Sequence, residues 1–120
     1  MSEAAEVVVR ILVAIEPQMY RQVLAFYIRQ ERPHSEVILA SSLTLQAEAE
    51  RMRPHLIIAD EVPSELMEMG SFFWVELSKE NSLVATISAN GHSATIDDVS
   101  LQDFLAVVDK AEEELAHDEA

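Results

Sequence analysis

The sequence predicts an α/β domain in which a mostly parallel sheet is covered by helices on both faces. Apolar runs rich in β-branched residues alternate with stretches whose apolar residues recur at helical spacing. The run over residues 7–15 is broken only by Arg10, which is typical of a strand buried on both faces. Such alternation is the pattern of a three-layer sandwich. With 120 residues and no linker or internal repeat, the chain is expected to form a single domain over residues 1–120.

Proline and polar residues mark out the first two helices. Pro17 suits the first position of a helix, and Pro33 ends it. The apolar residues at helical spacing in this helix are Met19, Val23, Phe26 and Tyr27. Residues 36–40 are then expected to form a short second strand. A second helix follows, with Ser42 or Thr44 as its cap.

The middle of the chain is expected to hold a third strand and a helical segment. Residues 56–59 are all apolar and predict a buried strand. Pro63 and Ser64 then open an irregular or helical stretch. Gly70 interrupts this stretch, and we expect residues 72–77 to resume it as a helix buried on one face.

A tight turn is expected to join the last two strands. Residues 83–89 and 94–96 are rich in apolar residues, and Asn90-Gly91 between them is a strong hairpin signal. A parallel connection needs a dozen or more residues, so the last strand should run antiparallel to the one before it. This geometry is expected to place Asp97, which follows the last strand, at the opposite end of the sheet from Asp60.

The C-terminal part predicts an amphipathic helix on an acidic segment. Residues 100–103 have the form of a capping box. The apolar residues on one face of the following helix are Leu101, Phe104, Leu105, Val108 and Leu115. From Asp97 onward there are nine acids and one base, Lys110. We interpret this charge as a solvated helix face followed by an acidic tail over about residues 116–120.

Composition excludes several classes of function. The net charge of -14 at pH 7 repels phosphate backbones and anionic lipid, so direct binding to nucleic acid or membrane is not expected. No apolar run approaches the length of a bilayer span, and the acidic start lacks the basic residues of a signal peptide. The chain has no cysteine, which excludes disulfides and thiolate metal sites. A cytoplasmic location is the expectation that fits these features.

Two acids follow buried strands, at the place where chemistry gathers in parallel sheets. Glu16 comes just after the first predicted strand, and Asp60 ends the third. Ligands and reactive groups of α/β sheets sit at the carboxyl ends of the strands. If these two strands are neighbours, the carboxylates face each other. Taken alone, Asp60 is either a turn-forming acid or a positioned reactive group, and Glu16 is either solvent-facing or a metal ligand.

Three stretches resemble the receiver domains of bacterial response regulators: "ILVAIEPQMYRQVLA", "RPHLIIAD" and "VATISA". The resemblance implies a flavodoxin-like, receiver-like fold over most of the chain. It implies that Asp60 is the phosphoacceptor and that Ser88, followed by Ala89, is the switch hydroxyl. It also implies a Mg²⁺ site, which here would consist of Glu16 and Asp60 and bind the ion weakly.

The chain departs from the pattern of that family at three places. Two adjacent acids usually follow the first strand, and here the pair is Ile15-Glu16. The position of the family's lysine after the fifth strand is occupied by Asp97. Only five residues separate Ser88 from Ala94, so the family's fourth helix is not expected.

These features predict a degenerate receiver, or pseudo-receiver, that acts in signal transduction through protein contacts. The expected partners are a histidine kinase or an output domain, with a homodimer as a further expectation. Asp60 would be a handicapped phosphoacceptor. The alternative is a dimerisation or scaffold module that kept only the fold. An enzyme is not expected, because a hydrolase using Asp60 as nucleophile would need a second acid and a base nearby.

Overall fold

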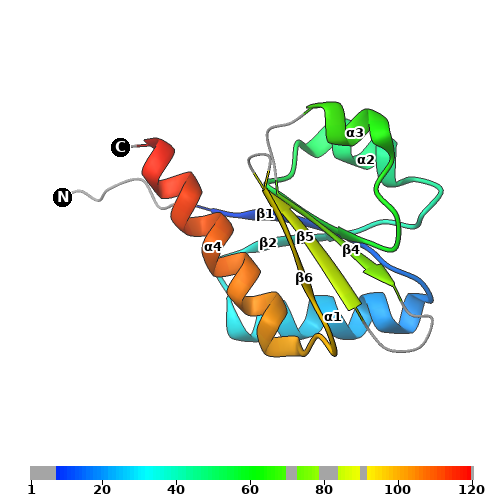
Figure 1. Cartoon of the computed structure of the whole chain (residues 1–120), viewed down its shortest axis with the longest axis horizontal. Coiled ribbons are helices and arrows are strands. Elements are labelled where there is room, and N and C mark those ends of the chain that lie inside the picture. Colours follow the sequence, from blue (N-terminus) through cyan, green and yellow to red (C-terminus); the bar gives the residue numbers. More distant parts are fainter. Residues whose placement is uncertain (1–7, 70–72, 79–83, 90–91, 120) are drawn as a thin grey trace.

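Six strands and four helices form an α/β domain in residues 8–69, 73–78, 84–89 and 92–119, which the computed structural model describes (Figure 1). The strands are β1 (Arg10–Ala14), β2 (Glu36–Leu39), β3 (Leu56–Ala59), β4 (Phe73–Ser78), β5 (Val84–Ala89) and β6 (His92–Ile96). The helices are α1 (Gln18–Glu31), α2 (Leu45–Met52), α3 (Ser64–Met69) and α4 (Leu101–Glu119). In these residues no helix has the length and apolar character needed to cross a membrane.

The strands make one mixed sheet in the order β2-β1-β3-β4-β5-β6. β1 pairs in parallel with β2 and β3, and β3 pairs in parallel with β4. β4 and β5 are antiparallel, as are β5 and β6. The expected α/β class is therefore confirmed, as are the neighbouring positions of β1 and β3 and the antiparallel pairing of the last two strands.

The prediction of a helix over residues 72–77 is wrong, because this segment contains β4 (Phe73–Ser78); Phe72 lies outside the described residues. Phe73, Val75 and Leu77 are buried, whereas Trp74 and Glu76 between them are half-buried. This period of two is that of a strand, and the aromatic run concealed it. As a consequence, β5 is the fifth strand of the chain and not the fourth.

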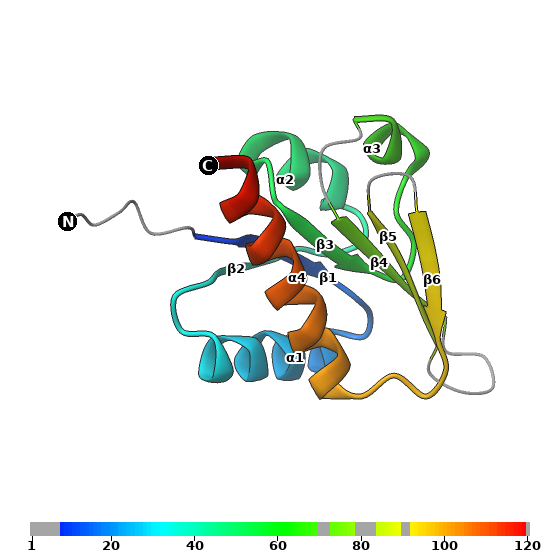
Figure 2. The ribbon, with the colours of Figure 1, turned by 60° about the vertical axis from the view of Figure 1, so that its left-hand side comes forward.

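Helices cover both faces of the sheet (Figure 2). In β1, Ile11 and Val13 pack in a cluster with residues of α1 and α4. Leu12 and Ala14 point to the other face and pack with residues of α2 and α3. Both faces of β1 are therefore buried, which accounts for its continuous apolar sequence.

The apolar residues of α1 divide between the core and the surface. Leu24, Ala25 and Ile28 are buried against the sheet. Of the residues predicted for the buried face, only Tyr27 packs partly against the core. Met19, Val23 and Phe26 are 64%, 53% and 66% exposed. Helical spacing identified the helix correctly but assigned its inward face wrongly, because α1 carries an apolar stripe on each side.

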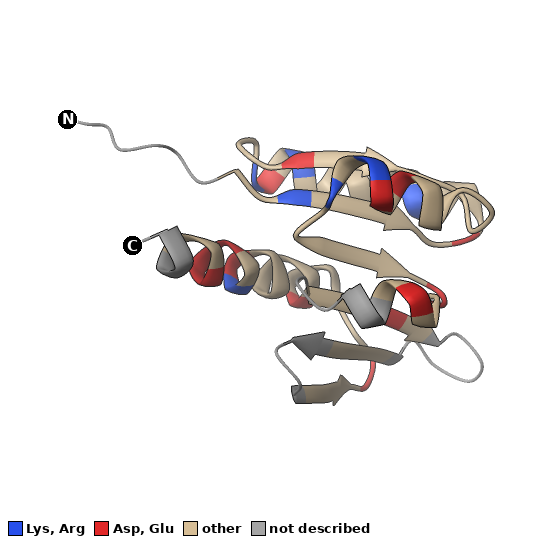
Figure 3. Cartoon of the chain, turned by 90° about the horizontal axis from the view of Figure 1, so that it is seen from above, with Lys and Arg blue, Asp and Glu red and all other residues tan. Residues whose placement is uncertain are grey.

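The acidic α4 is joined to the residues after α1 by an ion pair and by a second contact to a histidine. Arg32 donates from Nε and Nη2 to the two carboxylate oxygens of Asp109, at 2.7 and 2.8 Å. His34 Nε2 lies 3.0 Å from a carboxylate oxygen of Glu112. Acidic residues along α4 are shown in Figure 3. The helix continues to Glu119, so residues 116–119 are helical and do not form the predicted tail.

The predicted capping box starts α4. The backbone N–H of Ser100 donates to Asp103 Oδ2 at 2.8 Å. In return, the backbone N–H of Asp103 donates to the Ser100 hydroxyl at 3.3 Å. Reciprocal bonds of this kind satisfy donors that the first turn of a helix would otherwise leave open.

Candidate functional site

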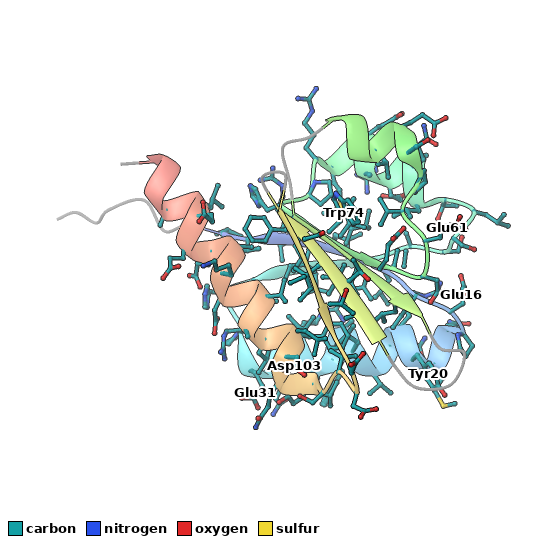
Figure 4. All side chains as sticks on the ribbon, in the orientation of Figure 1. Glu16, Tyr20, Glu31, Glu61, Trp74 and Asp103 are labelled. Carbon is teal, nitrogen blue, oxygen red and sulfur yellow. The ribbon has the colours of Figure 1, made fainter. Side chains whose placement is uncertain are left out.

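The loops that follow β1, β2 and β3 meet at the carboxyl edge of the parallel strands. Ala14 at the end of β1 is in register with Ala59 at the end of β3, and Glu16 and Asp60 follow closely. The sheet therefore brings together the two acids that the sequence singled out. Figure 4 labels Glu16 and the exposed Glu61 on this side of the molecule.

Asp60 connects two neighbouring loops. Its Oδ2 accepts a hydrogen bond from the backbone N–H of Glu16 at 2.8 Å. The side chain is half-buried. A carboxylate that accepts a backbone N–H forms a charge-assisted bond, which is stronger than a neutral one. Asp60 therefore fixes the loop after β1 to the end of β3.

The carboxylate of Glu16 contacts α1 and the loop after β2. Its Oε2 accepts the backbone N–H of Ser42 at 3.0 Å and lies 3.2 Å from Nη1 of Arg21. The hydrogen bond from Ser42, assisted by the positive charge of Arg21, lowers the pKa of Glu16. Glu16 is thus a paired anion at the same edge of the sheet as Asp60.

Arg21 extends from α1 and binds two groups at this edge of the sheet. Its side chain is only 12% exposed. Besides Glu16, its Nη1 donates to the backbone oxygen of Ala40, just past β2, at 2.9 Å. The first turns of α1 are therefore attached to the ends of both β1 and β2.

Glu76 is a residue of this edge that sequence reasoning missed. It is in register with Ala59 on the adjacent strand β4, and its Oε2 accepts the backbone N–H of Val62 at 2.9 Å. The assignment of a helix to residues 72–77 removed it from consideration. The alternation of buried Val75 and Leu77 around it is the signal that identifies its position.

Three carboxylates thus connect neighbouring loops across the carboxyl edge. Glu76 on β4 binds the backbone after β3, Asp60 after β3 binds the backbone after β1, and Glu16 after β1 binds the backbone after β2. The bonds follow the order of the strands in the sheet. Each acid acts here as an acceptor for a loop N–H, so the first role of this cluster is to hold the loops.

The two residues predicted as Mg²⁺ ligands have protein partners in this structure. Glu16 Oε2 accepts from Arg21 and from the Ser42 amide, and Asp60 Oδ2 accepts from the Glu16 amide. Magnesium takes several oxygen ligands in near-octahedral geometry. Within the described part of the chain, no group of three or more histidine or acidic residues is placed to hold a metal. A weak Mg²⁺ site at Glu16 and Asp60 stays a prediction.

Ser88 does not lie beside Asp60. β5 runs antiparallel to β4, so its last residues are at the amino edge of the parallel strands. Ser88 is in register with Trp74, which is in register with Ile57, near the start of β3. The position implied by the resemblance is therefore wrong, because it presumed a parallel strand.

The predicted position of Asp97 is also wrong. Two successive antiparallel pairings return β6 to the direction of β4, so Asp97 follows β6 at the same edge as Asp60. β4 and β5 stand between β3 and β6 in the sheet. Three interstrand steps amount to roughly 14 Å. Asp97 is thus separated from Asp60 across the sheet, in the direction perpendicular to the strands, and not along the strands.

His55 forms a second polar cluster, at the amino edge of the sheet. Its Nδ1 accepts the backbone N–H of Arg10 at 2.9 Å, and its own N–H and carbonyl bond to Arg10 and Phe73. Burial, and then the charge of Arg10, lower the pKa of His55. His55 is half-buried, whereas His34 is exposed.

The outer face of α1 carries four exposed apolar side chains: Met19, Tyr20, Val23 and Phe26. Each of these side chains is more than half exposed. Residues 18–30 of α1 include Arg21 and Arg29 but no acid, although the chain carries 22 acids in all. The helix therefore contributes apolar side chains and no acid of residues 18–30 to this face. Clusters of exposed apolar side chains of this kind mark interaction surfaces.

The chain matches no protein-family model, no curated protein and no solved structure.

Proposed function

We propose that this protein is a receiver-like signalling domain that acts by binding a partner protein, and that the outer face of α1 is its binding surface. The observation that carries the proposal is the exposure of Met19, Tyr20, Val23 and Phe26 in a stretch without acids. Tyr20 and Phe26 are 52% and 66% exposed, and aromatic side chains of this size contribute strongly to binding when they are buried. A partner helix could bury them all, because they recur at helical spacing.

The chemistry of the partner follows from the charges around this surface. Arg29 lies on α1 beside the apolar stripe, and Arg21 is directed inward to Glu16. The chain as a whole is strongly acidic, with a net charge of -14. An amphipathic partner helix that binds with its apolar side against Val23 and Phe26 would avoid electrostatic repulsion by the acids of this protein. A histidine kinase or an output domain, the partners implied by the resemblance, would offer such a helix.

The receiver-like part of the proposal is supported by the strand order. β2, β1, β3 and β4 lie side by side and parallel, and an acid follows both central strands. This is the order of flavodoxin-like sheets. The segment from β5 to β6 departs from it, because two antiparallel strands stand where a helix and a parallel strand are expected.

In this proposal Asp60 is a handicapped phosphoacceptor. A phosphoryl group would add about two negative charges to an edge that already holds Glu16 and Glu76. It would also have to displace the bond between Asp60 and the Glu16 amide, which joins two loops. Binding is therefore proposed to be the principal activity, and phosphorylation to be slow.

The alternative is a scaffold or dimerisation module in which the carboxyl edge performs no chemistry. The three carboxylate–amide bonds favour it, since they give each acid a structural task. Intact mass measured after incubation with Mg²⁺ and acetyl phosphate separates the two. Slow labelling that Asp60→Asn abolishes supports the handicapped phosphoacceptor, and no labelling at all supports the scaffold.

The binding surface is tested with two matched substitutions. Phe26→Glu places a charge on the α1 face, at its most exposed apolar side chain, and Leu43→Glu places the same charge on an apolar side chain that is 94% exposed elsewhere. A cellular partner that uses α1 should be retained by the wild type and by Leu43→Glu, and lost with Phe26→Glu. A partner retained by both variants would contradict the assignment of α1.

A further inference from the structure

The outer edge of β6 is an open strand edge. β6 is the last strand of the sheet, and in Figures 1 and 2 no helix or strand of the described chain lies beyond it. Ser93, Ala94 and Thr95 are exposed. The strand contains no acid, lysine, arginine or proline, which are the residues that usually protect an edge from pairing.

The opposite edge of the sheet is protected in the way that β6 is not. β2 begins with the exposed acid Glu36. The backbone carbonyl of Val37, also on β2, accepts a hydrogen bond from Nη2 of Arg29 at 2.9 Å. A side chain from α1 thus occupies an acceptor of this edge strand. The contrast indicates that pairing is blocked at β2 and permitted at β6.

From this contrast we infer that β6 pairs with β6 of a second copy of this chain, antiparallel and centred on Ala94, so that the sheet continues through a twofold axis. In an antiparallel pair, facing residues must direct their peptide groups to the same side. A symmetric pair is therefore centred on a single residue. Only a centre at Ala94, the middle of His92–Ile96, pairs all five residues of β6.

The side chains agree with this register. Ser93 of each copy would face Thr95 of the other, and cross-strand pairs of hydroxyl residues stabilise sheets. Ala94 would face its own counterpart at the axis, where a small residue lets the strands approach. This pairing is independent of the proposed role of α1, which lies in a different part of the fold.

The charge of the chain selects the antiparallel arrangement. Each copy carries a net charge of -14, so two copies associate only where their acids are kept apart. In the antiparallel register, Asp97 and Asp98 of the two copies lie at opposite ends of the new pair. A parallel pair would instead set the same acids side by side. Because β6 contains no acid, lysine or arginine, no like charges of these residues meet along the interface.

A short edge pairing buries little surface, so the expected dimer is weak. Interfaces below the usual size are typical of transient complexes. Analytical ultracentrifugation should therefore show the dimer fraction rising as the protein concentration increases from about 10 to about 500 μM. Ala94→Lys places two lysines directly opposite each other and should raise the Kd by at least about tenfold. Ala47→Lys, on an exposed alanine of α2, adds the same charge and should leave the Kd within about twofold of the wild type.

Cysteine cross-linking provides a second measurement, since the chain has no cysteine of its own. Facing residues of an antiparallel pair have Cα atoms about 4.5–5.5 Å apart, which a disulfide spans. Under mild oxidation Ala94→Cys should form a covalent dimer several times faster than Ala47→Cys. The inference is overturned if the wild type stays monomeric throughout that range, if both lysine variants weaken the dimer equally, or if both cysteine variants cross-link at the same rate.

Discussion

Replacing Asp60 with alanine should lower the free energy of unfolding by about 1.5–2 kcal/mol, because a charge-assisted hydrogen bond is lost. The substitution removes the acceptor of the Glu16 N–H, which Asp60 Oδ2 binds at 2.8 Å. Hydrogen bonds to charged groups contribute about 1.5–3 kcal/mol. Asp60 is half-buried, so the lower part of that range applies. For a domain of this size the melting temperature should fall by roughly 5 °C.

Two variants isolate the bond from the charge. Asp60→Asn keeps an oxygen that can accept the N–H but makes the bond neutral, and should fall between the wild type and Asp60→Ala. Glu61→Ala removes the next acid along the chain, which is exposed, and should change stability by no more than about 0.5 kcal/mol. Both comparisons use urea unfolding, with the slope of the transition expected to stay constant.

The interpretation that Asp60 holds the two loops together is refuted if Asp60→Ala does not lower the free energy of unfolding. An acid held only for reaction, in a chain of net charge -14, should be neutral or slightly stabilising to remove. If Asp60→Ala proves as stable as Glu61→Ala, the bond to the Glu16 amide does not hold the loops. That result would favour a reactive role for the Asp60 carboxylate.

Three further changes test other parts of the fold. The pKa of His55 is lowered from its usual 6.5, so the unfolded chain takes up the proton first. The free energy of unfolding should therefore fall as the pH drops below about 6.5. The substitution His55→Gln should make the free energy of unfolding depend less on pH. An unchanged pH dependence in that variant would contradict the assignment to His55. Arg32 lowers the pKa of Asp109, so Asp109→Asn should cost at most about 1 kcal/mol at neutral pH, since the pair is partly exposed. The loss should shrink as the pH falls below the usual pKa of 3.8 and vanish only below the lowered pKa of the folded state. Asp97→Lys should not improve labelling of Asp60 by acetyl phosphate, because two strands separate the residues, and improved labelling would refute the strand order.

The sequence by itself determined the parts of the fold that rest on local patterns. The apolar runs at β1 and β3 have four or five consecutive residues that are buried on both faces, so no other structure suits them. Ser100 and Asp103 fixed the start of α4, and the short Asn90-Gly91 connection required β5 and β6 to be antiparallel. The nearness of Glu16 and Asp60 followed from two parallel strands lying side by side.

Only the tertiary structure decided what those residues do. A carboxylate within reach of several partners can bind a metal, a phosphoryl group or a backbone amide, and the pattern of the chain is the same in each case. Arg21 and the Ser42 amide bind the Glu16 carboxylate, and both reach it through the packing of α1 and the turn after β2. Whether α1 turned Leu24 or Val23 inward was likewise settled by packing.

The extra strand is the decision with the widest consequences. Residues 73–77 alternate buried and half-buried side chains, but their aromatic run fits a helix equally well by sequence. Only pairing with β3 shows them to be a strand. That one strand reverses the direction of β5 and β6, moves Ser88 to the far edge, and leaves β6 open at the end of the sheet. Strand direction depends on the whole set of neighbours in a sheet, and a local pattern cannot fix it.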